Sequence, residues 1–458
     1  MENFWEFSAW GTYNLIAVLL LSLLLANILR KNIRVLNESL IPTSVLGGGI
    51  LIVIAAIYRL ITGDVMFDTK FFGGNGTANL ELITYHTLAL GFIASGLKTS
   101  DKKLTKSRMT EIFNTGLTTV NTYLIQAVVG MVITIIAAMI LPDFFEAAGL
   151  LLPFGYGQGT GQAMNYGNIY ETQFGFEGGK SFGLTVAALG FLSASIGGVI
   201  HLNIRKKHLR ARGSKIGVGN LSAEQIQNEN EIPMQDSVDK LTIQVALVAV
   251  AYMLAFFLML LLGKLIPGMK SVIFGFNFLL GVLSATLLKA LLNLLKRRGI
   301  AQKEYINNFL MTRVSNFFFD IMVVAGIAAI RLSMLEKYWG ILLILGLTGA
   351  FVTYWYVRMC CKVLFKDYCE EQFLGMYGML TGTASTGIIL LREIDGEFKT
   401  PAADNMVYQN FPAIVFGFPI MLLATLAPVK PYLTLGALAG LFLVFNVLMF
   451  RSIIFKKK

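Results

Sequence analysis

The chain has 458 residues, of which 55% are hydrophobic and only 14% are charged, and its mean hydropathy is +0.66. A soluble protein carries charge on about a quarter of its residues, so this composition excludes a mainly soluble fold. The net charge of +11 could indicate a nucleic-acid partner. However, the basic residues occur in short clusters between apolar runs, which is typical of cytoplasmic loops in membrane proteins.

The apolar runs are long enough to cross a bilayer, which takes about 20 residues each. No basic segment or small-residue cleavage site accompanies the first run, so we expect a retained helix rather than a signal peptide. We predict an all-α polytopic membrane protein with about 11 transmembrane helices. They span residues 13–29, 44–61, 82–98, 112–140, 181–202, 241–262, 271–295, 317–334, 338–364, 407–427 and 431–450.

The distribution of Lys and Arg predicts the orientation of these helices. With the N-terminus outside, most of the 38 basic residues lie on inner segments, and the outer loops are acidic or neutral. The positive-inside rule therefore predicts an outer N-terminus and a cytoplasmic C-terminus.

An odd number of crossings separates two similar halves of the chain. Five helices in residues 1–202 precede a polar stretch, residues 203–239, which we interpret as a cytoplasmic linker. Residues 240–428 would then form a second five-helix repeat of inverted orientation, as in inverted-repeat transporters. Residues 429–458 add one further transmembrane helix and a basic tail.

Each half contains a glycine-rich segment between its fourth and fifth helix, at residues 144–168 and 370–392. Each glycine costs a helix about 1 kcal/mol relative to alanine, and Pro153 adds a break, so neither segment suits a spanning helix. Either one alone could be a surface loop or a tight helix contact. Because the two recur at matching positions of inverted halves, we predict two re-entrant hairpins that enter the membrane from opposite sides.

The hairpin tips are the predicted binding site for a small solute and a coupling ion. Glycine lets the backbone approach a ligand, helix N-termini bind anions, and neutral carbonyl and hydroxyl oxygens suit a hard cation. The candidate substrate- and ion-binding residues are Gly157, Gln158, Gly159, Thr160, Gly161, Gly382, Thr383, Ser385 and Thr386, with Asp320 added as an intramembrane acid.

Five smaller signals remain, and four of them leave alternatives open. Asp320 could take part in ion coupling, or could lie near a polar helix end without a role in transport. His86 could relay protons or make a hydrogen bond that only packs helices, and Arg331 could clamp a carboxylate or anchor the chain at the interface. Residues 299–313 predict an interfacial amphipathic helix. One polar face of the fourth helix could line the transport path or join helices; it carries Asn114, Thr118 and Asn121, with Thr122 and Gln126 alongside.

These motifs make the sequence similar to the bacterial sodium:glutamate symporter family. The elements that carry the resemblance are residues 41–49, 94–97, 157–163 and 375–386, in an order shared from about residue 13 to 427. The resemblance implies sodium-coupled uptake of glutamate, a homodimer in the bacterial inner membrane, and an elevator-like movement of a mobile core. It also implies that the two re-entrant loops hold substrate and ion, with sodium and no other cofactor.

Some positions depart from the family pattern. Gln158 stands where the family has histidine, Thr348 is the polar residue in the middle of the ninth helix, and Ala384-Ser385 replaces a Thr-Pro tendency. We therefore keep the substrate broad, as glutamate or a related small amino acid or dicarboxylate.

Three other functions compete with sodium-coupled symport. A proton-coupled carrier or exchanger of another organic anion is the main alternative, and a channel is another. An enzyme would need a convergent set of nucleophile, base or metal ligands. The chain has three histidines, no paired intramembrane acids, and only Cys360, Cys361 and Cys369, without the spacing of a zinc site. We predict that it is not an enzyme.

Overall fold

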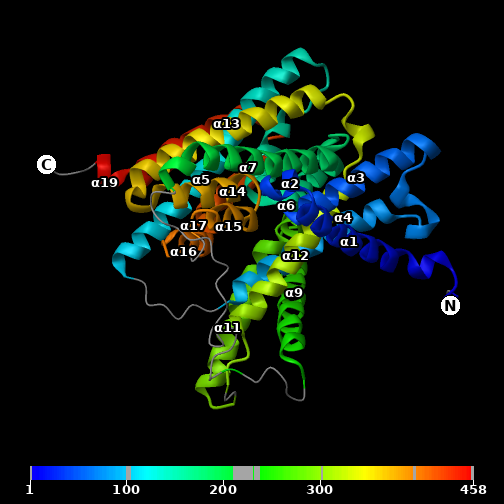
Figure 1. Ribbon diagram of the computed structural model, residues 1–458, viewed down its shortest axis with the longest axis horizontal. Helices are drawn as coiled ribbons and strands as arrows, with labels where there is room; N and C mark the ends of the chain where they lie inside the picture. The colour runs from blue at the N-terminus through cyan, green and yellow to red at the C-terminus, as the bar shows by residue number, and fades with distance from the viewer. Residues whose placement is uncertain are drawn as a thin grey trace. The chain divides into compact units, whose positions relative to one another are not determined.

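The computed structural model describes residues 3–98, 105–209, 231, 238–300, 303–395 and 399–454. Within these ranges the chain forms helices and turns without a strand (Figure 1). This confirms the predicted all-α class.

The N-terminal group of helices includes α6, which carries the first glycine-rich segment. They are α1 (Phe7–Asn32), α2 (Arg34–Glu38), α3 (Thr43–Thr62), α4 (Gly76–Leu97), α5 (Lys106–Ile140), α6 (Leu151–Phe174) and α7 (Gly179–Leu209). The next group is α9 (Lys240–Leu265), α10 (Lys270–Gly275), α11 (Asn277–Arg297) and α12 (Asn308–Ala328). The C-terminal group is α13 (Trp339–Leu364), α14 (Cys369–Thr381), α15 (Ala384–Arg392), α16 (Ala402–Tyr408), α17 (Asn410–Leu426), α18 (Pro431–Met449) and α19 (Arg451–Ile454).

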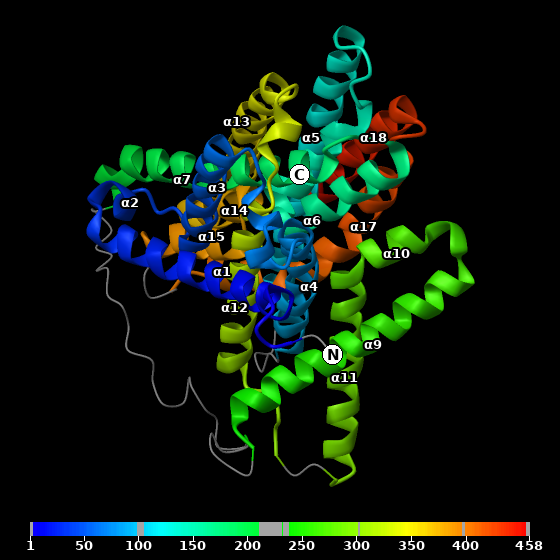
Figure 2. The ribbon, with the colours of Figure 1, turned by 90° about the vertical axis from the view of Figure 1, so that its right-hand side faces the viewer.

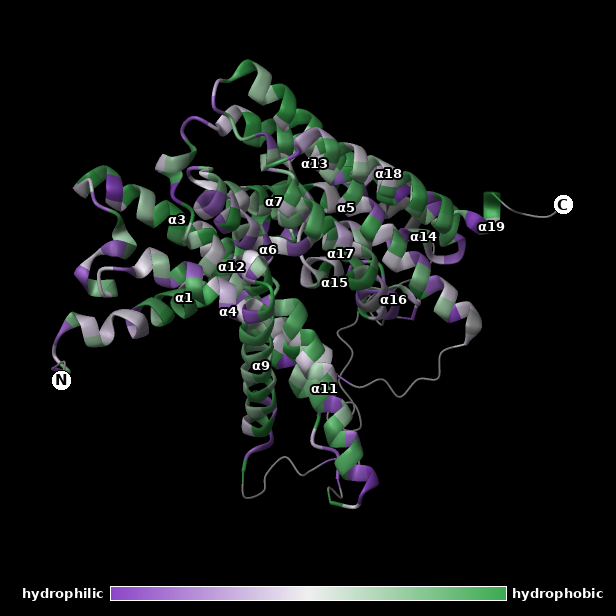
Figure 3. Ribbon diagram, turned by 180° about the vertical axis from the view of Figure 1, so that it is seen from behind, coloured by the Kyte–Doolittle hydropathy of each residue, from purple (hydrophilic) through white to green (hydrophobic). Residues whose placement is uncertain are grey.

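The number of membrane crossings agrees with the sequence prediction. In the part of the chain that the structure describes, 10 helices are long and apolar enough to cross a membrane. The pair Ala402–Tyr408 and Pro412–Leu426, bent by 51°, would make an eleventh. Figure 3 shows that α9 is hydrophobic over nearly its whole length, yet only 22% of its apolar window is buried. Such a surface needs lipid around it.

Three predicted elements differ from the structure. α7 continues to Leu209, so the predicted linker begins as helix, and residues 210–230 and 232–237 lie outside the described residues. The predicted interfacial helix at 299–313 is not a separate element, because α12 already begins at Asn308. The predicted seventh helix is two helices, α10 and α11, which meet at Phe276.

The described residues form two compact units. The first comprises those within 1–81, 104–218 and 323–458, and the second those within 82–103 and 219–322. The arrangement of two inverted halves stays a prediction.

The second unit is joined by hydrogen bonds among α4, α9, α10 and α11. The Tyr85 hydroxyl donates to the Phe274 carbonyl at 2.7 Å, and Asn277 Nδ2 donates to the Tyr85 carbonyl at 2.9 Å. His86 Nδ1 shares a hydrogen bond of 2.7 Å with the Tyr252 hydroxyl. His86 therefore joins α4 to α9, which is the packing role among the two alternatives that the sequence left open.

The first unit contains both glycine-rich segments. α5, α7 and α13 pack around α6 and α14, and α15 lies against α14 and α7 (Figure 2). This arrangement places helices from distant parts of the sequence around the two predicted hairpins.

Candidate functional site

The first glycine-rich segment is a helical hairpin. Two pairs of aromatic rings join its arms: Phe145 and Tyr170, with centroids 5.1 Å apart, and Phe154 and Tyr166, stacked at 4.1 Å. In a straight helix, twelve residues would separate the second pair by about 18 Å along the axis. The chain therefore turns back between them, and the turn is at Gly159, where φ is 78° and ψ is −171°.

Most of this hairpin is helical, contrary to the expectation that its glycines exclude helix. Only Gly159 leaves the helical conformation, in a positive-φ region that other residues rarely adopt. Pro153 lies in the first turn of α6, where a missing backbone N–H costs nothing. The neighbouring glycines instead allow close packing, since a side chain at Gly157 would collide with the ring of Tyr123.

The second glycine-rich segment is also two helices joined at a tip. α14 ends at Thr381 and α15 begins at Ala384, with Gly382 between them at φ −144° and ψ −105°. Thr383 caps α15, because its hydroxyl accepts a hydrogen bond of 3.4 Å from the N–H of Thr386. The tip thus presents hydroxyl oxygens beside a helix N-terminus.

Both tips meet the backbone of α7 at Gly190. A β-carbon there would collide with the carbonyl of Thr381, at the second tip, and would lie 3.1 Å from Tyr156, just before the first tip. The Tyr156 hydroxyl donates to the Gly346 carbonyl at 2.5 Å and also bonds to Ser193. α7 therefore brings the two predicted site segments together, although 223 residues separate Gly159 from Gly382.

α5 makes one hydrogen bond to each hairpin close to its tip. The Tyr123 hydroxyl donates to the Gly157 carbonyl at 3.0 Å, and Gln126 Nε2 donates to the Leu380 carbonyl at 3.1 Å. Two amide atoms beside the tips have no partner: Oε1 of Gln126 and Nε2 of Gln162, both buried. An unpaired buried polar atom costs about 1–3 kcal/mol. These atoms offer an acceptor and a donor to a polar solute.

The rest of the polar face of α5 points elsewhere. Thr118 and Asn121 contact the sulfur of Met449 in α18, and Asn114 accepts a hydrogen bond from Arg451. These three residues therefore join α5 to the C-terminal helices. Gln126, which the sequence placed alongside them, is the one that reaches a hairpin.

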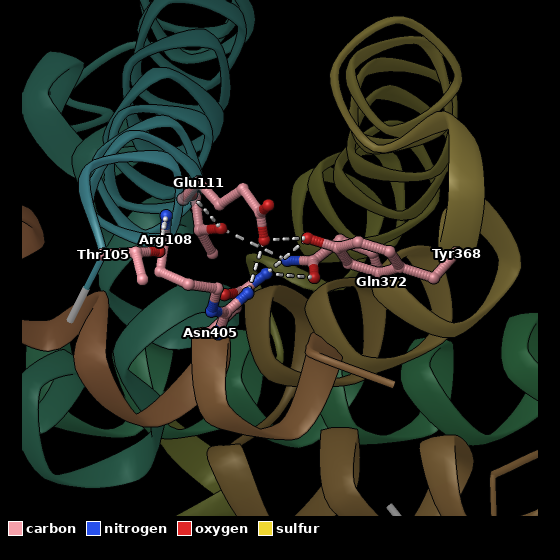
Figure 4. Close-up of polar contacts among 7 residues, drawn as sticks. Thr105, Arg108, Glu111, Tyr368, Gln372 and Asn405 are labelled. Carbon is pink, nitrogen blue, oxygen red and sulfur yellow. Dashed lines mark hydrogen bonds and ion pairs between the residues drawn. The ribbon is translucent and has the colours of Figure 1, made fainter. Parts of the chain in front are cut away.

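A polar network holds the base of the second hairpin against α5 and α16 (Figure 4). The Tyr368 hydroxyl donates to Glu111 at 2.7 Å and accepts from Asn405 at 3.0 Å, while Asn405 also donates to Gln372 at 3.0 Å. Glu111 pairs in turn with Arg108. Sequence reasoning missed this network, because its members are spread over about 300 residues.

An ion-paired cluster fixes the start of α14 to α7 and α13. His201 Nε2 bonds to Glu370 at 2.8 Å, its Nδ1 bonds to Tyr354 at 2.8 Å, and Arg358 Nη1 donates to Glu370 at 2.9 Å. His201 lies buried in α7. Burial alone would raise the pKa of Glu370, but the bonds from His201 and Arg358 lower it to about 2.

Most of the chain matches the model of a known protein family. Residues 8–399 match the family model described as sodium/glutamate symporter. The chain belongs to the sodium/glutamate symporter family. The matched residues include both hairpins and Gly190 of α7. No curated protein matches the chain.

Family membership makes the chain a transporter. Among the residues in the described ranges, no group of three or more His, Cys, Asp and Glu side chains could hold a metal ion. Asp320 lies well inside α12 rather than in its first turn, because the helix begins nine residues earlier than predicted. Asp320 also belongs to the second compact unit, whereas both hairpins belong to the first. Its role in ion coupling stays a prediction.

The lowered pKa of Glu370 predicts how pH affects stability. A carboxylate whose pKa falls on folding stabilises the protein above its unfolded pKa, near 4.5, and this stabilisation is lost as the pH falls toward 2. Glu370→Gln should therefore lower the melting temperature in detergent at pH 7. The difference from wild type should shrink by about pH 3.5. Glu177→Gln, which removes an exposed ion pair with Lys337, is the control. An equal difference at both pH values would contradict this account.

Proposed function

We propose that this symporter couples sodium entry to uptake of glutamate or a related small amino acid or dicarboxylate, at a site formed by the two hairpin tips. The observation that carries the proposal is the convergence of both tips on Gly190, beside the unpaired amide atoms of Gln126 and Gln162. Family membership supports the ion and the class of solute.

The chemistry of the tips suits both ligands. Thr160, Thr383, Ser385 and Thr386 supply hydroxyl groups, and the backbone around Gly159 and Gly382 supplies carbonyls, which are the oxygen ligands that a hard cation prefers. A helical arm begins just after each tip. The N–H groups of its first turn can bind a carboxylate. No cofactor is needed beyond the sodium ion.

The remaining parts of the proposal concern the whole transporter. Two inverted repeats would bring the hairpins into the membrane from opposite sides, and an elevator-like movement of the core would expose the site alternately. We further propose a homodimer in the bacterial inner membrane with its N-terminus outside and its C-terminus in the cytoplasm. The inner location of most Lys and Arg residues supports that orientation.

Uptake into proteoliposomes tests the coupling ion. Labelled glutamate should accumulate steeply with outside sodium, because solute and ion share one site, and accumulation should collapse when the sodium gradient is dissipated. A panel of amino acids and dicarboxylates under the same gradient defines the substrate. Uptake that does not depend on sodium and is driven by an imposed pH gradient would instead support a proton-coupled carrier.

Replacing Gly159 tests the site. Gly159→Val should abolish uptake, since a branched side chain cannot easily adopt φ 78° and would fill the tip. Gly299→Val is a matched control, because Gly299 has φ 74° and open space around it, away from the hairpins. Thr160→Ala and Ser385→Ala should each weaken the apparent affinity by about 1 kcal/mol.

Initial uptake rates of the variants and wild type are compared at equal amounts of protein inserted in the membrane. Normal uptake and affinity in Gly159→Val would place the site away from this hairpin. If Gly159→Val fails to insert, the two alanine variants decide the question, and unchanged affinity in both would refute the site.

A further inference from the structure

Two adjoining cavities form one groove along α3 in the first compact unit. The first, about 580 Å³, lies between α3 and α7 and is lined by apolar groups such as Val45, Gly49 and Leu192. The second, about 750 Å³, continues along the last turns of α3. Both are within the range of about 300–1,000 Å³ typical of ligand pockets. They adjoin because they share four lining residues: Ile52, Ile330, Leu332 and Trp339.

The second cavity differs from the first by its polar groups. Arg59, Arg331 and Thr77 line it, as does one acid, Glu336. The Arg331 Nε atom and the Thr77 hydroxyl are buried without a hydrogen-bond partner, and Thr77 is only 2% exposed. Neither arginine forms an ion pair with Glu336 or with any other carboxylate in the described ranges. The buried Nε atom of Arg331 and the buried hydroxyl of Thr77 can both donate hydrogen bonds to an anion, and the exposed guanidinium of Arg59 adds a second positive charge.

We infer that this groove binds one anionic phospholipid, with its phosphate at Arg59, Arg331 and Thr77 and an acyl chain between α3 and α7. The reason is that the two ends require different chemistry. A small anion would leave the apolar end empty, whereas a neutral hydrocarbon would leave the Arg331 Nε atom and the Thr77 hydroxyl unpaired. Basic pockets between membrane helices recognise lipid headgroups in this way. α3 is an apolar candidate membrane span with little buried surface, which gives lipid access to the groove.

The groove is independent of the hairpin site proposed above. Its lining residues do not include the tips, and nothing in the inference needs sodium or glutamate to bind there. Arg331, which the sequence left as either an interfacial anchor or a carboxylate clamp, therefore becomes a ligand for a lipid phosphate.

Binding to the purified, delipidated full-length chain in detergent tests the inference. The probes are phosphatidylglycerol, phosphatidylcholine with the same acyl chains, glycerol 3-phosphate, and glutamate. Phosphatidylglycerol should bind more tightly than the other three.

Charge variants test the headgroup end. Arg59→Gln and Arg331→Gln should each weaken phosphatidylglycerol binding about fivefold, because a basic group near a lipid surface contributes about 1 kcal/mol. Glu336→Gln should strengthen it, because it removes the one negative charge in the cavity.

Glycine variants test the acyl end. Gly49→Leu should weaken phosphatidylglycerol binding without loss of stability, because a β-carbon at Gly49 meets nothing within 4 Å and the added side chain would occupy the cavity. Gly436→Leu in α18 is the matched control, since Gly436 is equally open and lies outside the groove.

Four results would overturn the inference. These are equal binding of both phospholipids, no effect of either arginine variant, equal effects of Gly49→Leu and Gly436→Leu, and displacement of phosphatidylglycerol by glutamate. Binding of glycerol 3-phosphate as tight as that of the lipid, and unaffected by Gly49→Leu, would show a site for a small anion instead. Melting temperatures of all variants identify any that lose binding only because they unfold.

Discussion

Close packing of both hairpin tips against the backbone of α7 is the constraint on which the proposed site depends. At Gly190 no side chain separates α7 from the second tip at Thr381 or from the first at Tyr156. A larger residue at position 190 would push the tips apart. The free backbone groups at the tips would then need other hydrogen-bond partners. Interrupted helices survive in a membrane only where protein or water satisfies their free backbone groups. The contact with α7 therefore allows two broken helices to meet inside an apolar protein.

Polar anchors fix the hairpins away from their tips. The second hairpin is held at its base by the cluster of Glu370, His201 and Arg358, and by the network that links Tyr368 to Glu111. Near the tips the contacts are fewer: Gln126 and Tyr123 each bond to one backbone carbonyl. Firm attachment at the base and unpaired amide atoms at the tip suit the role proposed for this segment, which is to bind and release a solute. The geometry thus agrees with a transporter, whose site must fill and empty in each cycle.

Hydropathy and glycine spacing predicted much of this structure, because both act locally. Apolar runs predicted the crossings, and recurrent glycines predicted where the helices break, at Gly159 and close to Gly382. Neither signal could show that only Gly159 leaves the helical conformation in α6. Gly157 is needed for another reason, because a side chain there would collide with the ring of Tyr123. The burial of His201 in α7 and the early start of α12 depend on tertiary contacts that one sequence does not reveal. Likewise, Gly190 carries no motif, and its importance appears only when two distant segments meet at it.

Solute protection of one introduced thiol in each hairpin tests most directly whether the two tips form a single site. Gln158→Cys and Ala384→Cys, each made with Cys369→Ser, place a reactive thiol at the first and second tip, while Cys360 and Cys361 are buried. The rate of maleimide labelling is measured with neither ligand, with sodium alone, and with sodium and glutamate. A single site predicts that sodium and glutamate together slow labelling at both positions over the same range of glutamate concentration. Protection at only one position, or at neither, would contradict a site shared by the two hairpins.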